Sequence, residues 1–384
     1  MDFDLGEDQR MLKDGVERLL ADHYDFEQRR AIVAGPEGWS RTLWRQFAEM
    51  GLLALPFSEA DGGLNAGPVD LMLVMEAFGR HLVVEPFLAS VILAGGCLRR
   101  GASAAQRAAW LPPLIAGERV LALAHAERAA RYDLSHVDTR ARRDGRGWIL
   151  DGAKAFVLAG DAADQLIVSA RTDGTTTDRE GISVFMVDAN APGLKRRGYS
   201  TQDGTRAADM VLAGVHVGAD RLIGIEDAGL DVIERSVHEA LAALCAEAVG
   251  TMSRAHEQTV EYMKQRKQFG VAIGTFQALQ HRAVDMLVLI EQARSMTLYA
   301  TMMVAATDSA DRARAVSAAK IQIGRSAKFV GEQAVQLHGG IGVTEECQIG
   351  HYYRRLTMME LLFGDTGHHL TALARAGGVP ESTG

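Results

Sequence analysis

The chain has 384 residues, 47% of them hydrophobic, and carries a formal net charge of −8 from 49 acidic and 41 basic side chains. This apolar content is enough for a large core divided among two or three domains. The negative charge, without any basic run, argues against a nucleic-acid-binding surface. No stretch reaches the roughly 18 consecutive apolar residues of a membrane span. We therefore expect neither a nucleic acid nor a membrane as a partner.

The cysteines and the N-terminus indicate the compartment. The three cysteines, Cys97, Cys245 and Cys347, are odd in number, and none stands in a C-x-x-C or C-x-x-H pair. This pattern argues against a disulfide framework or a zinc site. Residues 1–8 are acidic where a signal peptide would be basic. The pair His368–His369 has no Cys or carboxylate at metal-ligand spacing. We expect a cytoplasmic protein without a metal.

The first two segments of the chain differ in their apolar pattern. In residues 1–118, apolar side chains recur at helical spacing, as at Leu43, Phe47 and Met50, which predicts an N-terminal helical domain. Residues 119–228 instead contain short runs of β-forming residues separated by turns, which predicts a middle antiparallel β-domain. Its clearest predicted strands are 148–152, 165–170 and 182–187.

The last segment, residues 229–384, is helical again and predicts a C-terminal four-helix bundle. Its long helical stretches are 230–268, 276–306, 310–338 and 348–375. Gly339–Gly340 directly after the third stretch is a plausible helix stop. Because strands and helices are segregated along the chain instead of alternating, the predicted fold class is α+β.

Two motifs of the last segment carry a resemblance to a known family. The first is Arg266-Lys-Gln-Phe269-Gly270, and the second begins Gln336-Leu-His-Gly339-Gly340. In this order and spacing they resemble motifs of the acyl-CoA dehydrogenase family, and the order of the domains extends the resemblance over nearly the whole chain. Within the family, the sequence looks most similar to the small subunit of pimeloyl-CoA-type dehydrogenases.

The resemblance implies FAD as the cofactor, an acyl-CoA as the substrate, and a homo- or heterotetramer. It also implies that both motifs reach across a subunit interface to a neighbour's FAD. Arg266 can pair with pyrophosphate oxygens in a bidentate fork, and Phe269, expected one helical turn on, can cover an apolar part of the cofactor. Gln336 suits the adenine end, and the backbone at Gly339 and Gly340 can approach a phosphate or ribose. Singly, each residue is better explained as a surface charge, a packed aromatic or a helix stop.

The general base of the family is missing at both of its usual positions. The reaction needs a carboxylate that removes a proton next to the thioester carbonyl. In the turn that carries this Glu in most members, Phe363 precedes the matching Gly364. Other members place the Glu on the first helix of the last segment, where aligning on Arg266 gives Ala240 and Leu241. None of these side chains accepts a proton.

Three other carboxylates are candidate replacements for the base. Glu247 lies seven residues beyond Ala240 and returns to nearly the same helix face. Glu239 is one residue away and points about 100° around the helix. Asp365 follows the matched glycine directly. Each is equally well explained as a solvated or interhelical charge, so no catalytic residue is confirmed.

The flavin-side motifs are altered as well. The family's T-E-P-x-x-G-S-D loop reads Ala-Glu-Arg-Ala-Ala-Arg-Tyr-Asp over residues 126–133, and its W-I-T/S motif reads Phe156-Val-Leu158. Phe156 keeps an aromatic contact for the cofactor, but the hydroxyl is lost. Arg128 and Arg131 could pair with the free carboxylate of a dicarboxyl-CoA, or they are exposed surface charges.

The retained motifs would complete a neighbour's FAD site, whereas the altered ones would hold the chain's own flavin. We therefore predict a partner subunit that completes the FAD site of a related large subunit in a heterotetramer. One alternative is a self-sufficient homotetramer with a relocated carboxylate base. Another is a structural homologue without a redox role.

Overall fold

The computed structural model describes residues 5–378, so the predicted limits at residues 1 and 384 lie outside the described range. The chain forms two compact units, one of Met1–Ala31, Pro68–Val83 and Leu241–Gly384 and the other of Ile32–Gly67 and Val84–Ala240. The two units group residues that lie close together in space, whereas the predicted bounds at residues 118 and 228 mark changes of pattern along the sequence. The bounds therefore stay predictions.

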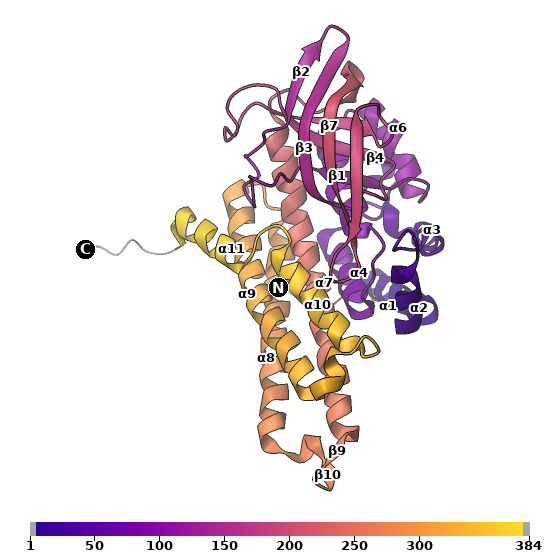
Figure 1. The fold of residues 1–384 in the computed structure, drawn as a ribbon, viewed down its shortest axis with the longest axis vertical. Helices are drawn as coiled ribbons and strands as arrows, with labels where there is room; N and C mark the ends of the chain where they lie inside the picture. The colour runs from indigo at the N-terminus through magenta and orange to yellow at the C-terminus, as the bar shows by residue number, and fades with distance from the viewer. Residues whose placement is uncertain (1–4, 379–384) are drawn as a thin grey trace, which may run out of the picture. The chain divides into compact units, whose positions relative to one another are not determined.

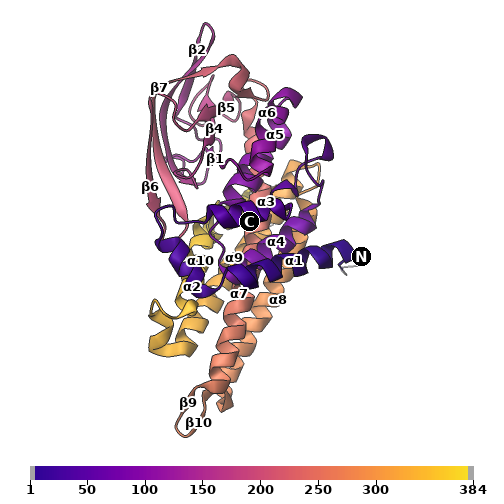
Figure 2. The ribbon, with the colours of Figure 1, turned by 90° about the vertical axis from the view of Figure 1, so that its right-hand side faces the viewer.

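The first unit is helical. Figures 1 and 2 show two of its long helices running side by side to a small hairpin. Its helices are α1 (Glu7–His23), α4 (Pro68–His81), α7 (Gly229–Gln265) from Leu241 on, α8 (Gln277–Met303), α9 (Ser309–His338), α10 (Gln348–Leu361) and α11 (Thr366–Leu373), and the hairpin strands are β9 (Lys267–Gln268) and β10 (Val271–Ala272).

Two of the predicted C-terminal helices differ from the observed ones. The first was expected to continue to residue 268, but α7 ends at Gln265 because the β9–β10 hairpin follows. The fourth, predicted as one helix over 348–375, is divided into α10 and α11 by a turn at Phe363–Gly364. Phe363 and Gly364 both have positive φ, which no continuous helix tolerates.

Helices α4 and α7 cross with their backbones in direct contact. A Cβ on Gly79 would lie 1.9 Å from the carbonyl oxygen of Glu247, and a Cβ on Gly250 would lie 1.9 Å from that of Glu76. The Thr251 hydroxyl donates to the Gly79 carbonyl at 3.2 Å. Only glycine fits at these two positions, and this crossing fixes α7 against α4.

The second unit is built on an eight-stranded sheet with strand order β6-β7-β3-β2-β4-β5-β8 and β1 paired to β4. The pairs β1–β4 and β2–β4 are parallel, and the other pairs are antiparallel, so the predicted β-domain is mostly antiparallel. The strands are β1 (Leu121–Ala124), β2 (Arg140–Asp144), β3 (Gly147–Leu158), β4 (Gln165–Arg171), β5 (Ile182–Asp188), β6 (Leu194–Ser200), β7 (Arg206–Gly218) and β8 (Leu222–Ile223). Strands β3, β4 and β5 are the three that the sequence predicted.

One face of this sheet packs on a buried core that includes Trp148, Leu150, Phe185 and Met210. Helices of the same unit include a π-helical segment at Leu88–Ala94, and within it Ser90 accepts the Leu121 N–H of β1 at 2.8 Å. The other α-helices are α2 (Phe26–Ala34), which crosses the unit boundary, α3 (Arg41–Glu49), α5 (Gly95–Gly101) and α6 (Ala104–Ile115). Short helical segments of the second unit are Leu52–Ala54, Glu59–Asp61 and Ala219–Arg221, and those of the first unit are Ile273–Thr275, Gly339–Val343 and Ala374–Gly378. The succession of helices, sheet and helices along the chain confirms the predicted α+β class.

Gly250→Ala should destabilise the protein by about 1–3 kcal/mol or more, because the added methyl must push α7 away from the Glu76 carbonyl. Urea unfolding of the full chain measures this loss. Gly340→Ala is the matched control, since a Cβ at Gly340 meets nothing within 4 Å. Equal unfolding midpoints for the two variants would show that the helices do not cross this closely.

Candidate functional site

Several residues singled out from the sequence share an unusual backbone conformation. A bulky residue with positive φ is a genuine outlier that costs roughly 1–3 kcal/mol, and such strain clusters at functional sites. Within residues 5–378, eight non-glycine residues have positive φ, and four of them are positions that the sequence motifs identified, namely Arg131, Phe156, Phe269 and Phe363. The fold therefore maintains a costly backbone at both the retained and the altered motifs.

Phe269 forms the tip of the β9–β10 hairpin. Its φ of 54° and the φ of 82° at Gly270 place both central residues in the left-handed region, as a tight two-residue hairpin requires. The expectation that Phe269 lies one helical turn beyond Arg266 is wrong, because α7 has already ended. The side chain is 92% exposed, and its ring makes an edge contact with the Phe276 ring, 6.2 Å away between centroids. The hairpin thus projects an aromatic ring away from the core.

The second motif forms an open turn at the end of α9. The helix ends at His338 as predicted, and Gly339 has φ 64° and ψ −146°, a conformation that glycine adopts without strain. A Cβ on Gly339 or Gly340 would meet nothing within 4 Å, and Gln336 is exposed one turn earlier. The backbone of this turn is open to a ligand from outside the chain.

The two motifs are joined by a contact that sequence reasoning missed. Tyr262, four residues before Arg266, stacks on His338, directly before Gly339, with ring centroids 4.3 Å apart and planes at 21°. The Tyr262 hydroxyl also donates to the His338 carbonyl at 3.4 Å. Burial lowers the pKa of His338, which favours the neutral ring. This stack fixes the base of the hairpin against the glycine turn, so the retained residues form one constellation.

The turn at Phe363 keeps its backbone but not its chemistry. Phe363 has φ 57° and Gly364 has φ 114°. The buried ammonium of Lys320 donates to the carbonyl of Gly364 at 2.6 Å and to that of Glu360 at 2.8 Å, and burial lowers the pKa of Lys320. A cation at the C-terminal end of α10 also stabilises the helix dipole. The turn itself is thus firmly held, and the expectation that Phe363 occupies the position of the family's base stays a prediction.

Glu247, the first candidate replacement for the base, is part of a buried ion pair. Its side chain is 3% exposed and accepts two hydrogen bonds from the Arg355 guanidinium, at 2.7 and 2.8 Å. A carboxylate in a bidentate pair with arginine is strongly favoured in its charged form. This arrangement serves the packing of α7 on α10.

The other two candidates also have structural partners. Glu239 forms ion pairs with Arg99, at 2.5 Å, and with Arg100. Asp365 caps α11 by accepting the His368 N–H at 2.7 Å. A relocated base at Glu247, Glu239 or Asp365 would have to leave these contacts, and none of the three becomes a confirmed catalytic residue.

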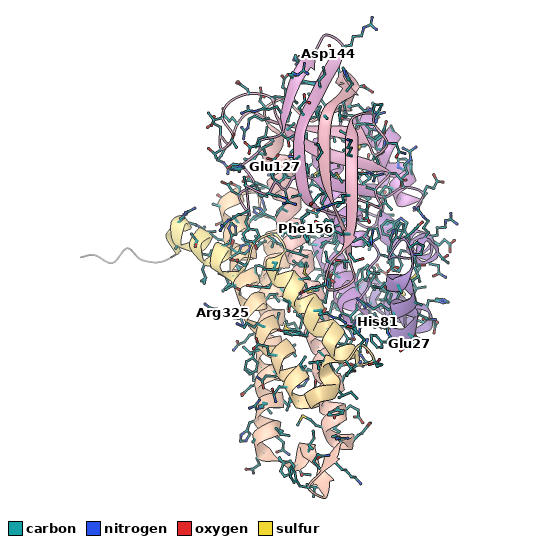
Figure 3. The ribbon with its side chains drawn as sticks, viewed as in Figure 1. Glu27, His81, Glu127, Asp144, Phe156 and Arg325 are labelled. Carbon is teal, nitrogen blue, oxygen red and sulfur yellow. The ribbon has the colours of Figure 1, made fainter. Side chains whose placement is uncertain are left out.

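Phe156, labelled in Figure 3, belongs to β3, where the pairing with β7 is irregular. The pairing of β3 with β7 shifts register between Lys154 and Val157, and the Phe156 N–H donates to the Asp209 carboxylate at 3.2 Å. Burial alone raises the pKa of Asp209, but the Phe156 N–H and neighbouring donors outweigh it and lower that pKa. Asp209 therefore holds the Phe156 peptide in its left-handed conformation, whereas Leu158, two residues on, offers no hydroxyl to a flavin.

Glu127, which the altered loop retains from the family pattern, anchors that loop. Its carboxylate accepts hydrogen bonds from Lys154 at 2.7 Å, from the Thr139 hydroxyl at 2.6 Å and from the Asp138 N–H at 2.7 Å. Burial raises its pKa, but the Lys154 charge and these donors lower it to about 2. Burial lowers the pKa of Lys154 to about 8. The Lys154–Glu127 pair is structural. The sequence pattern did not predict it, because the two residues are 27 positions apart.

The candidate substrate arginines lie on the surface of the β-domain. Arg128 is 79% exposed and pairs with Asp209 at 3.0 Å. Arg131 is exposed and has φ 51°. Their predicted pairing with a substrate carboxylate stays a prediction.

Further features of residues 5–378 bear on other classes of function. No group of three or more His, Cys, Asp or Glu side chains in this range could hold a metal ion. No helix within it has the length and apolar character needed to cross a membrane. All three cysteines are free thiols.

The domain patterns of one family cover the chain. Those described as acyl-CoA dehydrogenase N-terminal, middle and C-terminal domain match residues 6–118, 122–215 and 227–378. The chain belongs to the acyl-CoA dehydrogenase family. Enzymes of this family are FAD-dependent oxidoreductases that act on CH–CH bonds. The exposed Arg266 and Phe269 and the open turn at Gly339–Gly340 fit such a cofactor, because a planar ring and a diphosphate need an aromatic surface, a cation and accessible N–H groups.

Individual relatives cover most of the chain. Acyl-CoA dehydrogenase FadE12 of Mycobacterium tuberculosis is 30% identical over 309 residues, or 79% of each chain. Among solved structures, the ChsE4–ChsE5 complex from Mycobacterium tuberculosis is 26% identical with a TM-score of 0.89 and covers 100% of both chains. A variant of the Tcur3481–Tcur3483 steroid ACAD is 30% identical with a TM-score of 0.87, covering 98% of this chain and 99% of that one. PigA, solved with FAD and proline, is 27% identical with a TM-score of 0.91 over 98% and 99%.

Glu247→Gln should destabilise the protein by about 3–5 kcal/mol, because it removes the negative charge that forms a bidentate pair with the buried Arg355 guanidinium. Asp365→Ala removes only a helix cap and should cost about 0.5–2 kcal/mol. Urea unfolding compares the two variants. If Glu247→Gln kept full stability and lost only turnover, Glu247 would be a base and its structural role would be refuted.

Proposed function

We propose that this chain is the partner subunit of an acyl-CoA dehydrogenase complex. In this arrangement it completes the FAD site of a related large subunit, which supplies the carboxylate base, in a heterotetramer with two chains of each kind. The reaction is the α,β-dehydrogenation of an acyl-CoA thioester. The single observation that supports this division most is the contrast between the exposed, joined Arg266–Gly340 constellation and the Phe363 side chain at the base position.

The chain's own residues would act by binding and orientation. The Arg266 guanidinium pairs with the diphosphate of the partner's FAD, and Phe269 covers an apolar part of the same molecule. Gln336 donates and accepts at the adenine end, and the N–H groups at Gly339 and Gly340 approach the diphosphate or ribose. When bound, FAD supplies the hydride acceptor of the reaction. Because Tyr262 and His338 hold the hairpin against the turn, these contacts are arranged before the partner arrives.

An apolar face of α8 supports assembly with a partner. The inner face of α8 is buried through Met286, Ile290 and Ala293, as a packed helix requires. On the outer side, large apolar side chains recur at helical spacing and are 40–56% exposed, namely Val284, Leu287, Val288, Tyr299 and Met302. These residues form two exposed apolar groups, one at 284–288 and one at 299–302, and such groups suit contact with another protein surface.

The relatives also support two kinds of subunit. The ChsE4–ChsE5 complex and the Tcur3481–Tcur3483 steroid ACAD are each named for two components. The self-sufficient alternative has less support, since Glu247 and Asp365 already serve an ion pair and a helix cap. We further propose a cytoplasmic location, to which the free thiols of Cys97, Cys245 and Cys347 are suited.

The chain purified alone should hold little flavin and show no acyl-CoA-dependent flavin reduction, whereas co-expression with a genomically adjacent homologue that carries an intact Glu should give both.

In the complex, Arg266→Gln should weaken FAD binding about 10- to 100-fold, as expected for a lost charged hydrogen bond. Flavin absorbance and a dilution titration measure the binding.

Lys264→Gln is the control for that experiment, because Lys264 is an exposed cation near the same end of α7. It should leave the affinity within about twofold, as exposed charges contribute little. Full flavin loading and turnover by this chain alone would refute the partner role and favour the homotetramer.

For the substrate we propose a dicarboxyl-CoA whose free carboxylate pairs with Arg128 or Arg131. The support is that both cations replace uncharged residues of the family's flavin-side loop and are exposed on the β-domain. A carboxylate buried with an acyl chain needs such a partner.

Replacement of Arg131 by methionine (Arg131→Met) should lower kcat/KM for pimeloyl-CoA about tenfold and leave that for octanoyl-CoA unchanged, because only the first substrate has a free carboxylate. Arg142→Met on β2 is the control for removing an exposed β-domain cation. An equal effect on pimeloyl-CoA and octanoyl-CoA would refute the proposed pairing of Arg131 with the free carboxylate of a dicarboxyl-CoA.

A further inference from the structure

A hollow of about 670 Å³ lies on the β-domain between the loop that begins at Glu127 and the strands β3, β6 and β7. This volume is in the range of small-molecule sites. The lining of the hollow combines buried residues, such as Met210 and Lys154, with the exposed Val211. Its lining includes residues 127–129 of the altered flavin-side loop, but none of the residues proposed to clamp the partner's FAD or to replace the base.

The charge of this hollow is unbalanced. Its lining has five basic side chains against three acidic ones. The Lys154–Glu127 pair is buried and mutually satisfied, and Arg196 donates to main-chain carbonyls, including those of Gly160 and Ala163. The basic groups left at the mouth are Arg128, Lys195 and Arg197.

Two of these cations compete for one carboxylate. Arg128 and Arg197 lie 3.0 and 3.1 Å from the same oxygen of Asp209, and their side chains are 79% and 77% exposed. The other Asp209 oxygen accepts the Tyr199 hydroxyl and the Phe156 N–H. Each guanidinium has five donors, so most of those on Arg128 and Arg197 remain available. One further carboxylate would balance two cations with two anions.

The floor of the hollow is apolar. In the register of the sheet, Val211 of β7 lies opposite Ala153 of β3 on one side and Lys195 of β6 on the other. Val211 is 50% exposed, and Ala155 adds a second small apolar surface. An ion alone would leave this floor in water, whereas a ligand with an alkyl body would cover it.

We propose that this hollow binds a small amphipathic anion, an alkyl body that ends in a carboxylate. Arg128 and Arg197 hold the carboxylate, and Val211, Ala153 and Ala155 contact the alkyl body. The site lies wholly within the β-domain and requires neither FAD nor a partner subunit. Through Arg128 it is linked to the proposed dicarboxyl-CoA substrate, but its binding of a carboxylate can be tested without FAD, turnover or a partner subunit.

The test is ligand-observed NMR and calorimetric titration of the full chain with hexanoate, 1-hexanol and inorganic phosphate. Hexanoate should bind more tightly than either of the other two, because only hexanoate has both parts. The double variant Arg128→Gln/Arg197→Gln should weaken hexanoate binding at least tenfold. Arg142→Gln, another exposed β-domain arginine, should leave it within about twofold.

Asp209→Asn provides a test of opposite sign. The amide oxygen can still accept the Phe156 N–H, but both guanidinium groups lose their competing anion, so hexanoate affinity should rise several-fold. The proposal is overturned if hexanoate binds the double variant as well as the original chain, if hexanol or phosphate binds as tightly, or if Asp209→Asn weakens binding. Because the substituted arginines are exposed, unchanged urea midpoints are expected and confirm that the variants fold.

Discussion

Left-handed backbone at phenylalanine is the constraint on which the site depends, because a large side chain adopts it only when its surroundings supply the free energy. At Phe156 the supply is the Asp209 carboxylate, which accepts the peptide N–H. At Phe269 it is the tight hairpin, which needs positive φ at both central residues. At Phe363 it is the Lys320 ammonium on the following carbonyl. Three different contacts thus hold three phenylalanine rings in directions that a regular strand or helix would not give them.

Backbone geometry and side-chain chemistry must therefore be considered separately at Phe363 and at Phe269. The turn at Phe363 has a firmly held backbone, but the Phe363 side chain cannot take a proton. The hairpin at Phe269 keeps both its geometry and its chemistry, with Arg266 beside it and the glycine turn joined to it through Tyr262 and His338.

Much of this organisation could be predicted from the sequence, and the failures have a common cause. Helical periodicity located α8 and α9 and β-forming runs located β3, β4 and β5, because these elements are set by local patterns. The hairpin after α7 was missed, since Lys267 to Val271 carries no strong β signal and two-residue strands leave almost no pattern. The Tyr262–His338 stack and the Asp209 contact to Phe156 join residues 76 and 53 positions apart. Pairings at such separations depend on tertiary structure, which no periodicity reports.

The exposure of Phe269 has a consequence for how the protein must be made. The ring is 92% exposed, and exposed apolar residues lie on α8 as well; in the proposed complex, the partner subunit covers these surfaces. A copy synthesised without its counterpart would keep these surfaces in water, where they favour self-association and capture by chaperones. Balanced production of the two chains would then be a physical requirement set by one hairpin, quite apart from any demand for activity.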